Sequence, residues 1–237
     1  MAGSEMQPIT VYWCAEVASK FPQLAISIGT INNVVVEREN PKIKELKKAL
    51  YMEVIAQHNV EGLKEYPVVR AYRDFYWRLG IDPTKTRPSG EALLRRVLHG
   101  SELPTISTAV DAYNLASMKT IIPISGFDRD TLHPPFNVRF AENGEVFTGI
   151  GMEKPMALTS NMLVLADTRR VLCIYPHRDA DQTKITLETK NILLVAYGAP
   201  GITRQQLEEA VKIALEYIKV CCGGEIEMIK VFSLTPK

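Results

Sequence analysis

The sequence has few cysteines, and their spacing excludes the common metal sites. Only four cysteines occur in 237 residues, and none forms a CxxC pair or has a histidine at metal-ligand spacing. Cys221 and Cys222 are adjacent and are followed closely by two glycines. We therefore expect all four cysteines to be packing residues in a reducing compartment, and we expect no metal and no cofactor.

The sequence also lacks a long hydrophobic run and an excess of charge of one sign. No apolar run approaches the roughly 18 residues of a membrane-spanning helix, and the N-terminus lacks the basic-then-apolar pattern of a signal peptide. The formal net charge is only +1. We expect a soluble, cytoplasmic protein with no membrane partner and no DNA partner, although a local basic patch remains compatible with RNA.

Motifs that define several large enzyme classes are missing. The sequence contains no GxGxxG after a strand, no GxxxxGK[ST], no HExxH and no GxSxG. These absences argue against a dinucleotide-binding domain, a P-loop NTPase, a zinc protease and an α/β hydrolase. Ser125 precedes a glycine, but it lies outside the frame of a nucleophile elbow, so a serine triad is not expected.

The composition is that of an ordinary globular protein, with 46% hydrophobic and 23% charged residues. Residues 1–7 are expected to form a disordered lead. The patterns predict helices over residues 41–58, 68–79, 89–99, 106–118 and 204–222, and strands over 9–17, 24–28, 34–36, 121–124, 138–140, 146–150, 162–166, 171–175, 184–187, 192–197 and 226–232. This order predicts an α+β fold in which helices flank a mixed or antiparallel central β-sheet, with residues 1–237 in one domain.

Capping residues mark several of the predicted helix ends. Asn40 followed by Pro41 is a strong helix start, and Ser89 and Thr203 are further candidate N-caps. Gly223 is placed to end the last helix.

The helix predicted over residues 68–79 mixes three arginines with four aromatic residues. That combination suits stacking against nucleic-acid bases. The spacing favours the alternative, in which the aromatic side chains form a core stripe and the arginines lie outside. A similar choice applies to the lysines of residues 41–58, which form either a solvated face or an edge that faces phosphate.

The polar residues that we expect to line one pocket come from three segments of the chain. They are Asn114, Ser117, Ser125, Asp128, Asp181 and Thr183. The first two lie in a predicted helix, the next two precede and end an expected Gly-Phe-Asp turn at residues 126–128, and the last two follow a predicted strand, where pockets recruit polar groups. Such a pocket offers hydrogen bonds and carboxylates but no strong nucleophile. Asp111 is expected to be mainly structural, as a buried acid that ties its helix to neighbouring backbone.

An ordered set of short motifs resembles one known family. The family pattern RPINxVVDVTNY resembles Leu103–Asn114, and HAFD resembles Ser125–Asp128. Further along, VIAD resembles Val164–Asp167, and the loop GGExS resembles Asp179–Thr183. The family is the editing domain of the phenylalanyl-tRNA synthetase beta subunit, the B3/B4 domain. The segment RPSGEALLRRVL is more similar still to stand-alone forms of this domain, and the resemblance covers residues 70–195.

The resemblance implies a protein that binds tRNA and hydrolyses the ester of a mischarged aminoacyl-tRNA in trans. It implies that Asp181 stands for a glutamate that helps to recognise the amino-acid moiety. Ser125 takes the place of the family histidine, so the amino acid is not assumed to be tyrosine. Contacts with tRNA are expected from the basic residues Arg87, Arg139, His177 and Arg178.

Two other functions stay open. The change from histidine to Ser125 favours a non-catalytic module that binds tRNA or a free amino acid, and a small-molecule enzyme on the same scaffold is the third candidate. The sequence has nothing that resembles the synthetase's catalytic core or its anticodon-binding domain. The chain by itself is therefore not expected to attach amino acids to tRNA.

Overall fold

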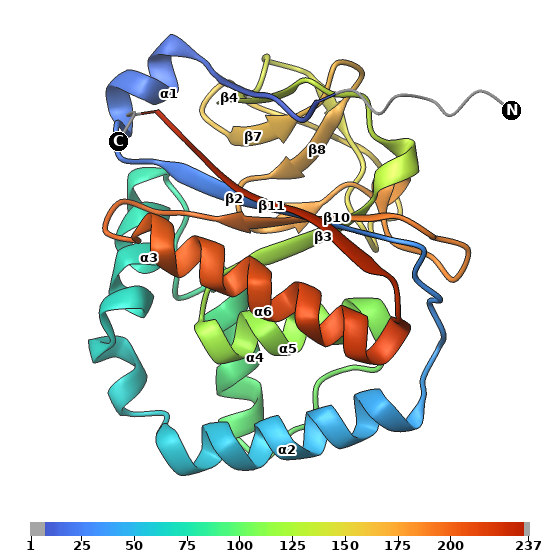
Figure 1. Cartoon of the computed structure of the whole chain (residues 1–237). Coiled ribbons are helices and arrows are strands. Elements are labelled where there is room, and N and C mark those ends of the chain that lie inside the picture. The colour runs from blue at the N-terminus through green and yellow to red at the C-terminus, as the bar shows by residue number, and fades with distance from the viewer. Residues whose placement is uncertain (1–7, 235–237) are drawn as a thin grey trace, which may run out of the picture.

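Two β-sheets and a group of helices are stacked in layers in the computed structural model, which describes residues 8–234 (Figure 1). The middle layer is a four-stranded antiparallel sheet with the strand order β11-β2-β10-β3. Its strands are β2 (Ala25–Asn32), β3 (Ile124–Asp128), β10 (Ile192–Tyr197) and β11 (Glu225–Ser233). Every residue of β10 is buried, as expected for a strand with layers on both faces.

A second sheet lies above the middle sheet in Figure 1. Its strands, in spatial order, are β1 (Val11–Trp13), β4 (Phe136–Phe140), β7 (Leu163–Ala166), β8 (Val171–Ile174) and β9 (Arg178–Asp179), and a separate pair joins β5 (Val146–Phe147) to β6 (Met156–Ala157). Only the pairing of β1 with β4 is parallel. Alternate residues of β7 face opposite ways, so Leu163 and Leu165 join the main core, whereas Val164 and Ala166 join a smaller one.

Most helices cover the other face of the middle sheet (Figure 1). They are α1 (Ala15–Lys20, beside the second sheet), α2 (Pro41–Gln57), α3 (Pro67–Arg78), α4 (Ser89–Leu98), α5 (Thr108–Thr120) and α6 (Arg204–Cys222), with short 3-10 turns η1 (Gly62–Glu65), η2 (Arg129–Thr131) and η3 (Asp181–Thr183). A glycine lets α6 approach the sheet closely. A Cβ atom on Gly29 of β2 would lie only 2.3 Å from Cγ1 of Val211 in α6.

The predicted capping residues of two long helices are confirmed. The Asn40 side chain accepts a hydrogen bond from the Ile43 amide at 3.1 Å, and α2 then begins at Pro41. Thr203 forms a capping box with Gln206 at the start of α6. Gly223 follows the last turn of α6 with a positive φ of 71°, which favours glycine.

The aromatic residues of α3 form a core stripe. Tyr72, Phe75 and Tyr76 are buried, whereas Trp77 is 57% exposed. The spacing that favoured packing over base stacking is therefore confirmed for three of the four rings.

The N-terminal segment differs from its predicted form. The predicted strand over residues 9–17 ends at Trp13, and α1 begins two residues later. The change occurs because the Cys14 sulfur accepts a hydrogen bond from the Val17 amide at 3.5 Å and caps this short helix. A β-rich composition did not reveal this local cap.

The segment after α5 was predicted in the wrong register. The left-handed Ile121, with a φ of 61°, follows the end of α5, and the strand begins only at Ile124. The expected turn at residues 126–128 is instead the second half of β3. Pairing with β10, a partner far along the chain, extends the strand through a Gly-Phe-Asp sequence that is typical of turns.

Three smaller predictions are also wrong. Pro88 rather than Ser89 occupies the N-cap position of α4, and no side chain caps that helix. Residues 34–36 and 184–187 form no strand, because their backbone groups bond mainly to loops and helix ends; the amide of Val34 donates to the carbonyl of Lys190.

The α+β class is confirmed, and the described residues form one globule. The strands that were expected in one central sheet divide between two stacked sheets. Residues 1–7, expected as a disordered lead, lie outside the described residues. Between residues 8 and 234, no helix combines the length and the apolar character that a membrane crossing requires.

Candidate functional site

A hydrogen bond between the two sheets marks the candidate site. Ser125 lies in β3 opposite Val195 of β10 and is 6% exposed. Its hydroxyl donates to Oδ1 of Asp179 at 2.6 Å. Asp179 ends β9 of the second sheet. The bond therefore joins residues that are 54 positions apart in the sequence.

The environment of Asp179 changes its acidity. Burial raises the pKa of this carboxyl from 3.8 to about 7, and the hydrogen bond from Ser125 opposes that rise. Near neutral pH both the acid and the carboxylate form are therefore populated. A carboxyl group in this state can accept a proton and return it, which is what a general acid-base catalyst does.

Two tyrosines and a cysteine complete the site. The ring of Tyr113, from α5, crosses β3 at Gly126, where a Cβ atom would lie 2.6 Å from the ring carbon Cε1. Tyr197, from β10, lies beside Cys173 and Ser125, and its buried hydroxyl makes no well-aligned hydrogen bond within residues 8–234. We refer to Ser125, Asp179, Tyr113, Tyr197 and Cys173 as the Ser125–Asp179 cluster.

Burial sets the protonation of the other cluster members. It raises the pKa of Tyr113 above its usual range, and the neighbouring Asp179 adds to the effect. The same two causes raise the pKa of the Cys173 thiol. Neither group is ionised at neutral pH, so Cys173 is not an activated nucleophile.

The segment from Asp181 to Thr189 runs along the edge of β3. Lys184 makes an antiparallel bridge to Phe127, and the Thr189 hydroxyl donates to Oδ2 of Asp128 at 2.7 Å. Thr183 is fully buried, and its hydroxyl has no partner in the described part of the chain. Asp181 lies farther out, where it forms an ion pair with Lys184 at 2.7 Å. The sequence expectation that this loop meets the Ser125–Asp128 segment agrees with this arrangement.

The residues predicted on α5 have different surroundings. Ser117 is buried and donates to the Ile122 carbonyl at 2.6 Å, so its hydroxyl stabilises the end of the helix. Asn114 is half-buried and follows Tyr113 of the cluster. Asp111 is structural as expected, because it accepts hydrogen bonds from Lys47 Nζ at 2.6 Å and from the Ile106 amide at 3.0 Å.

The four basic residues expected to contact tRNA have different surroundings, and their contact with tRNA stays a prediction. Arg139 forms a two-point ion pair with Glu145, at 2.7 and 2.9 Å. Burial lowers the pKa of His177 to about 4, so it is neutral at physiological pH. Arg178 lies against Gly149, and Arg87 lies in a separate depression beside α4.

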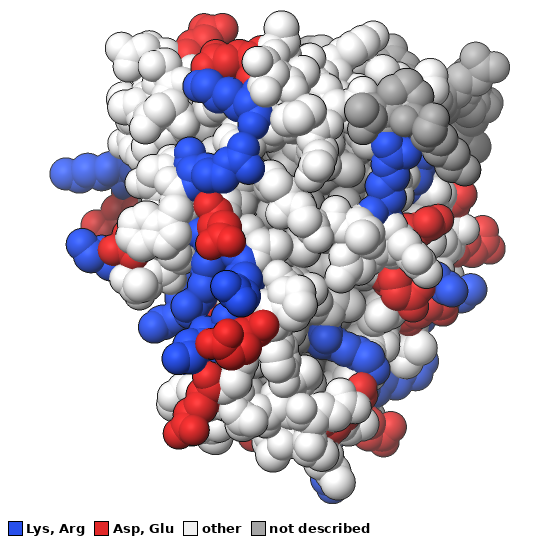
Figure 2. All heavy atoms as spheres, turned by 90° about the vertical axis from the view of Figure 1, so that its left-hand side faces the viewer, with Lys and Arg blue, Asp and Glu red and all other residues white. Residues whose placement is uncertain are grey.

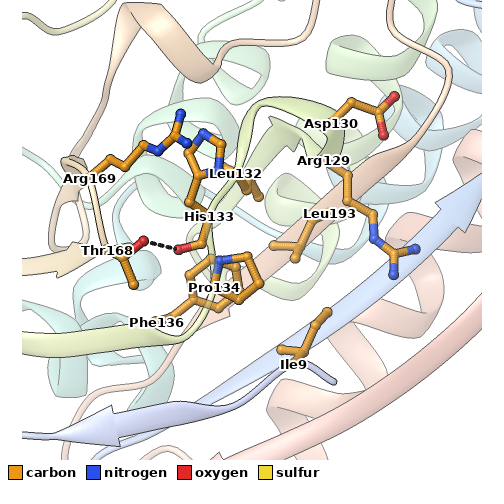
Figure 3. Close-up of a pocket in the computed structure, with 10 residues that line it drawn as sticks. All are labelled: Ile9, Arg129, Asp130, Leu132, His133, Pro134, Phe136, Thr168, Arg169 and Leu193. Atoms are coloured by element: carbon orange, nitrogen blue, oxygen red, sulfur yellow. Dashed lines mark hydrogen bonds between the residues drawn. The ribbon is translucent and has the colours of Figure 1, made fainter. Parts of the chain in front are cut away.

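An open cavity lies beyond the end of β3 (Figure 3). One of its lining residues, Arg129, directly follows β3 in the sequence. Its volume is about 570 Å³, and its lining residues are Ile9, Arg129, Asp130, Leu132, His133, Pro134, Phe136, Thr168, Arg169 and Leu193. Figure 3 shows Pro134 and Leu193 in the middle and Ile9 below them, with Arg169 on one side and Arg129 and Asp130 on the other. None of the residues predicted from the sequence lines this cavity. Asp130 is engaged by the Asn191 amide at 3.0 Å, and Arg129 by Glu227.

Residues 8–234 contain no group of three His, Cys, Asp or Glu side chains arranged to hold a metal ion.

A family model described as the B3/4 domain matches residues 71–223, more than half of the chain. The chain belongs to the B3/4 domain family. The match covers α5, β3, β8, β9 and β10, and therefore every residue of the Ser125–Asp179 cluster.

This B3/4 domain is similar to part of a larger protein. It is 29% identical to the phenylalanine–tRNA ligase beta subunit of Francisella tularensis over 155 residues, which is 56% of this chain and 20% of the relative. It is 26% identical to the Haemophilus ducreyi beta subunit over 160 residues, again 20% of that protein. The chain thus spans about a fifth of the length of these curated relatives.

A solved structure shares the fold of this B3/4 domain. It is an N-terminal fragment of the phenylalanyl-tRNA synthetase beta subunit from Pyrococcus horikoshii, with a TM-score of 0.50 and 14% identity. The similarity covers 95% of this chain and 52% of the fragment. At this identity the likeness shows the fold alone.

Of the five cluster members, only Ser125 was predicted from the sequence as a site residue; Asp179, Tyr113 and Tyr197 were missed, and Cys173 was expected only as a packing residue. Asp179 stands where the quoted family motif has glycine, and Tyr113 stands where that motif has threonine. These two departures were visible in the sequence, and both place a larger polar side chain at the same site. Tyr197 gave no such signal, because it ends an apolar strand like any packing residue.

Proposed function

We propose that this B3/4 domain binds aminoacyl-tRNA and hydrolyses the ester bond of a mischarged aminoacyl-tRNA in trans. The observation that carries the proposal is the Ser125–Asp179 hydrogen bond, which unites two of the motifs that resemble the editing domain around a carboxyl group whose pKa burial raises to about 7. The amino-acid moiety then lies at the cluster, and tRNA lies outside it.

The proposed reaction needs only one group that accepts and returns a proton. A water molecule attacks the ester carbonyl carbon while the Asp179 carboxylate takes the proton of that water. The bond from the carbonyl carbon to the ribose oxygen then breaks, and Asp179 returns the proton to that oxygen. The products are the free amino acid and tRNA with an intact terminal hydroxyl.

The Tyr197 hydroxyl supports the proposal. It lies beside Ser125 and Cys173 but makes no well-aligned hydrogen bond within residues 8–234, so it can donate to a developing oxyanion. An unpaired buried hydroxyl also discriminates among amino acids, because a side chain that leaves it unpaired is penalised. Asp181, at the exposed end of the segment, is the proposed contact for the amino-acid moiety.

A panel of mischarged tRNAs tests this proposal. The purified protein is expected to release the amino acid from at least one of them faster than a heat-treated control. Asp179→Asn should abolish that release, whereas Glu188→Gln, which makes the same change at an exposed site on the neighbouring segment, should not. Equal rates for the protein and the heat-treated control with every pair would refute hydrolysis.

A second function, a non-catalytic module for tRNA or a free amino acid, is favoured by one specific observation. Tyr113 and Asp179 replace a threonine and a glycine of the family motifs, and Ser125 replaces the histidine. The larger side chains fill space at the cluster. A thermal shift with a free amino acid in the absence of any ester hydrolysis would identify this function.

A further inference from the structure

A shallow depression beside α4 is lined by basic side chains and by no acidic one. Its volume is about 500 Å³, and its lining residues are Lys85, Arg87, Ala92, Arg95, Arg96 and His99. Lys85 and Arg87 come from the segment before α4, whereas the other basic residues belong to the last turn of that helix and the residue after it. We call this feature the α4 depression.

Three of its five basic side chains are fixed by hydrogen bonds. Arg95 donates to Glu91 at 2.7 Å, and Arg96 donates to the carbonyl of Glu102 at 2.6 Å. Nδ1 of His99 lies 2.7 Å from the carbonyl of Arg95, which can only accept a hydrogen bond, so this nitrogen carries a proton and the ring is held in place. Side chains that are already ordered lose little entropy when they bind an anion.

Neighbouring carboxylates offset only part of the positive charge of the depression. Asp82 interacts electrostatically with Lys85 but forms no ion pair with it within residues 8–234. Glu91 is 1% exposed and accepts hydrogen bonds from Arg73 of α3 at 2.5 and 2.9 Å as well as from Arg95. One carboxylate therefore serves two guanidinium groups. In the described part of the chain, Lys85, Arg87 and Arg96 form no ion pair. Figure 2 shows Lys and Arg side chains gathered in a band on the side of the molecule where α3 lies.

The helix dipole explains only part of this arrangement. Cations are favourable at the C-terminal end of a helix, which accounts for Arg95, Arg96 and His99 at the end of α4. It does not account for Lys85 and Arg87, which precede the helix and still line the same depression.

We propose that the α4 depression binds phosphodiester groups of the tRNA backbone. Arginine side chains match the geometry of phosphate oxygens, and a concave surface with several fixed cations holds adjacent phosphates better than one exposed lysine. The inference rests on the proposed function, since it takes tRNA as the partner. The inference adds a second surface to that function: the α4 depression holds the tRNA backbone while the aminoacylated end lies at the Ser125–Asp179 cluster.

Binding of uncharged tRNA at several salt concentrations tests the inference. Each phosphate neutralised on a duplex contributes about 0.9 to the slope of log affinity against log salt. The double variant Lys85→Gln/Arg87→Gln should therefore lower the magnitude of that slope by about 2, and affinity at low salt should fall by roughly tenfold or more. Both residues are exposed, so the thermal unfolding temperature should stay unchanged.

The matched control is Lys212→Gln/Lys219→Gln on α6, which removes the same charge at exposed positions of another helix. It should keep the slope of the unaltered protein. Equal slopes for the two double variants, or no tRNA binding by the unaltered protein, would overturn the inference. If the slope falls as expected but no mischarged tRNA is hydrolysed, the hydrolytic function fails and the α4 depression stands.

Discussion

The Ser125–Asp179 cluster and the α4 depression hold their polar groups in different surroundings. The cluster lies between two sheets, where Ser125 and Tyr197 are almost or fully buried and Asp179 is half-buried. The depression lies open to solvent, with Lys85, Arg87 and Arg96 exposed. One region has an acidic group whose pKa is raised by burial, and the other has several cations whose charge is retained.

The difference determines what each region can do. Burial penalises charge, so a carboxyl in the cluster exchanges protons near neutral pH, and packing around Gly126 fixes the shape that a ligand meets. Exposed cations attract a polyanion, but water and salt screen them and they impose little shape. We therefore assign chemistry and selection to the cluster and retention of the tRNA backbone to the depression.

Loss of the Asp179 carboxyl should have the largest effect. If the cluster performs the hydrolysis, Asp179→Asn should lower its rate by about 10²- to 10⁴-fold, the range typical of a general acid-base group. Affinity for uncharged tRNA should change little, because the depression is intact. Measuring both quantities on the same preparation separates the regions. A parallel loss of tRNA affinity would contradict the division of labour.

A change at Glu91 tests the α4 depression, the second region of the comparison. Glu91→Gln should destabilise the fold by about 2–4 kcal/mol, because Arg73 and Arg95 lose their shared buried carboxylate. This range lies below the one that is typical for breaking a fully buried ion pair, because both arginine side chains are partly exposed to water. Urea unfolding measures the change. Lys85 and Arg87 are unaltered in this variant, so the salt slope of its tRNA binding should stay that of the unaltered protein; a slope lowered as far as in Lys85→Gln/Arg87→Gln would count against the proposed role of those two residues.

The raised pKa of Asp179 predicts a pH-dependent stability. The native carboxyl keeps its proton up to about pH 7, whereas the unfolded one releases it near 3.8. The native state therefore binds more protons within this window. Its stabilising contribution is complete below the unfolded pKa and is lost as the pH rises through the native pKa.

This loss should disappear when the carboxyl is removed. Between about pH 5 and pH 8, the free energy of unfolding should fall by roughly 2 kcal/mol more in the unaltered protein than in Asp179→Asn. Urea titrations at the two pH values measure the difference, and Glu188→Gln serves as the exposed control. Identical pH dependence in all three proteins would show that Asp179 does not have a raised pKa.

Local signals made much of the fold predictable. Asn40 with Pro41, and Thr203 with Gln206, specify the two long helices through bonds made within four residues of the chain. The continuous apolar run of β10 and the spacing of the α3 aromatics were equally local. The register of β3 was not predictable in this way, because it depends on pairing with β10 across a long stretch of sequence.

The candidate site shows the same limit. The motifs located Ser125 and the segment that carries Asp179, and the structure brings these two together. Sequence spacing alone could not show that the Ser117 hydroxyl donates to a carbonyl just beyond the end of α5, or that Arg139 forms an ion pair with Glu145. The raised pKa of Asp179 could not be predicted from the sequence either, because it arises from burial between two sheets.

Ser125 provides the finest test of the cluster. Its hydroxyl donates to the ionised form of Asp179 and so favours that form. Ser125→Ala removes the donor and should raise the pKa of Asp179 further, by about one unit. The pH at which hydrolysis reaches half its maximum should move upward by the same amount, while the maximum rate at high pH changes little. Ser125→Thr keeps a hydroxyl and should restore the original midpoint. If Ser125 were instead the nucleophile, Ser125→Ala would abolish the rate at every pH, so the pH profile distinguishes a positioning residue from a catalytic one.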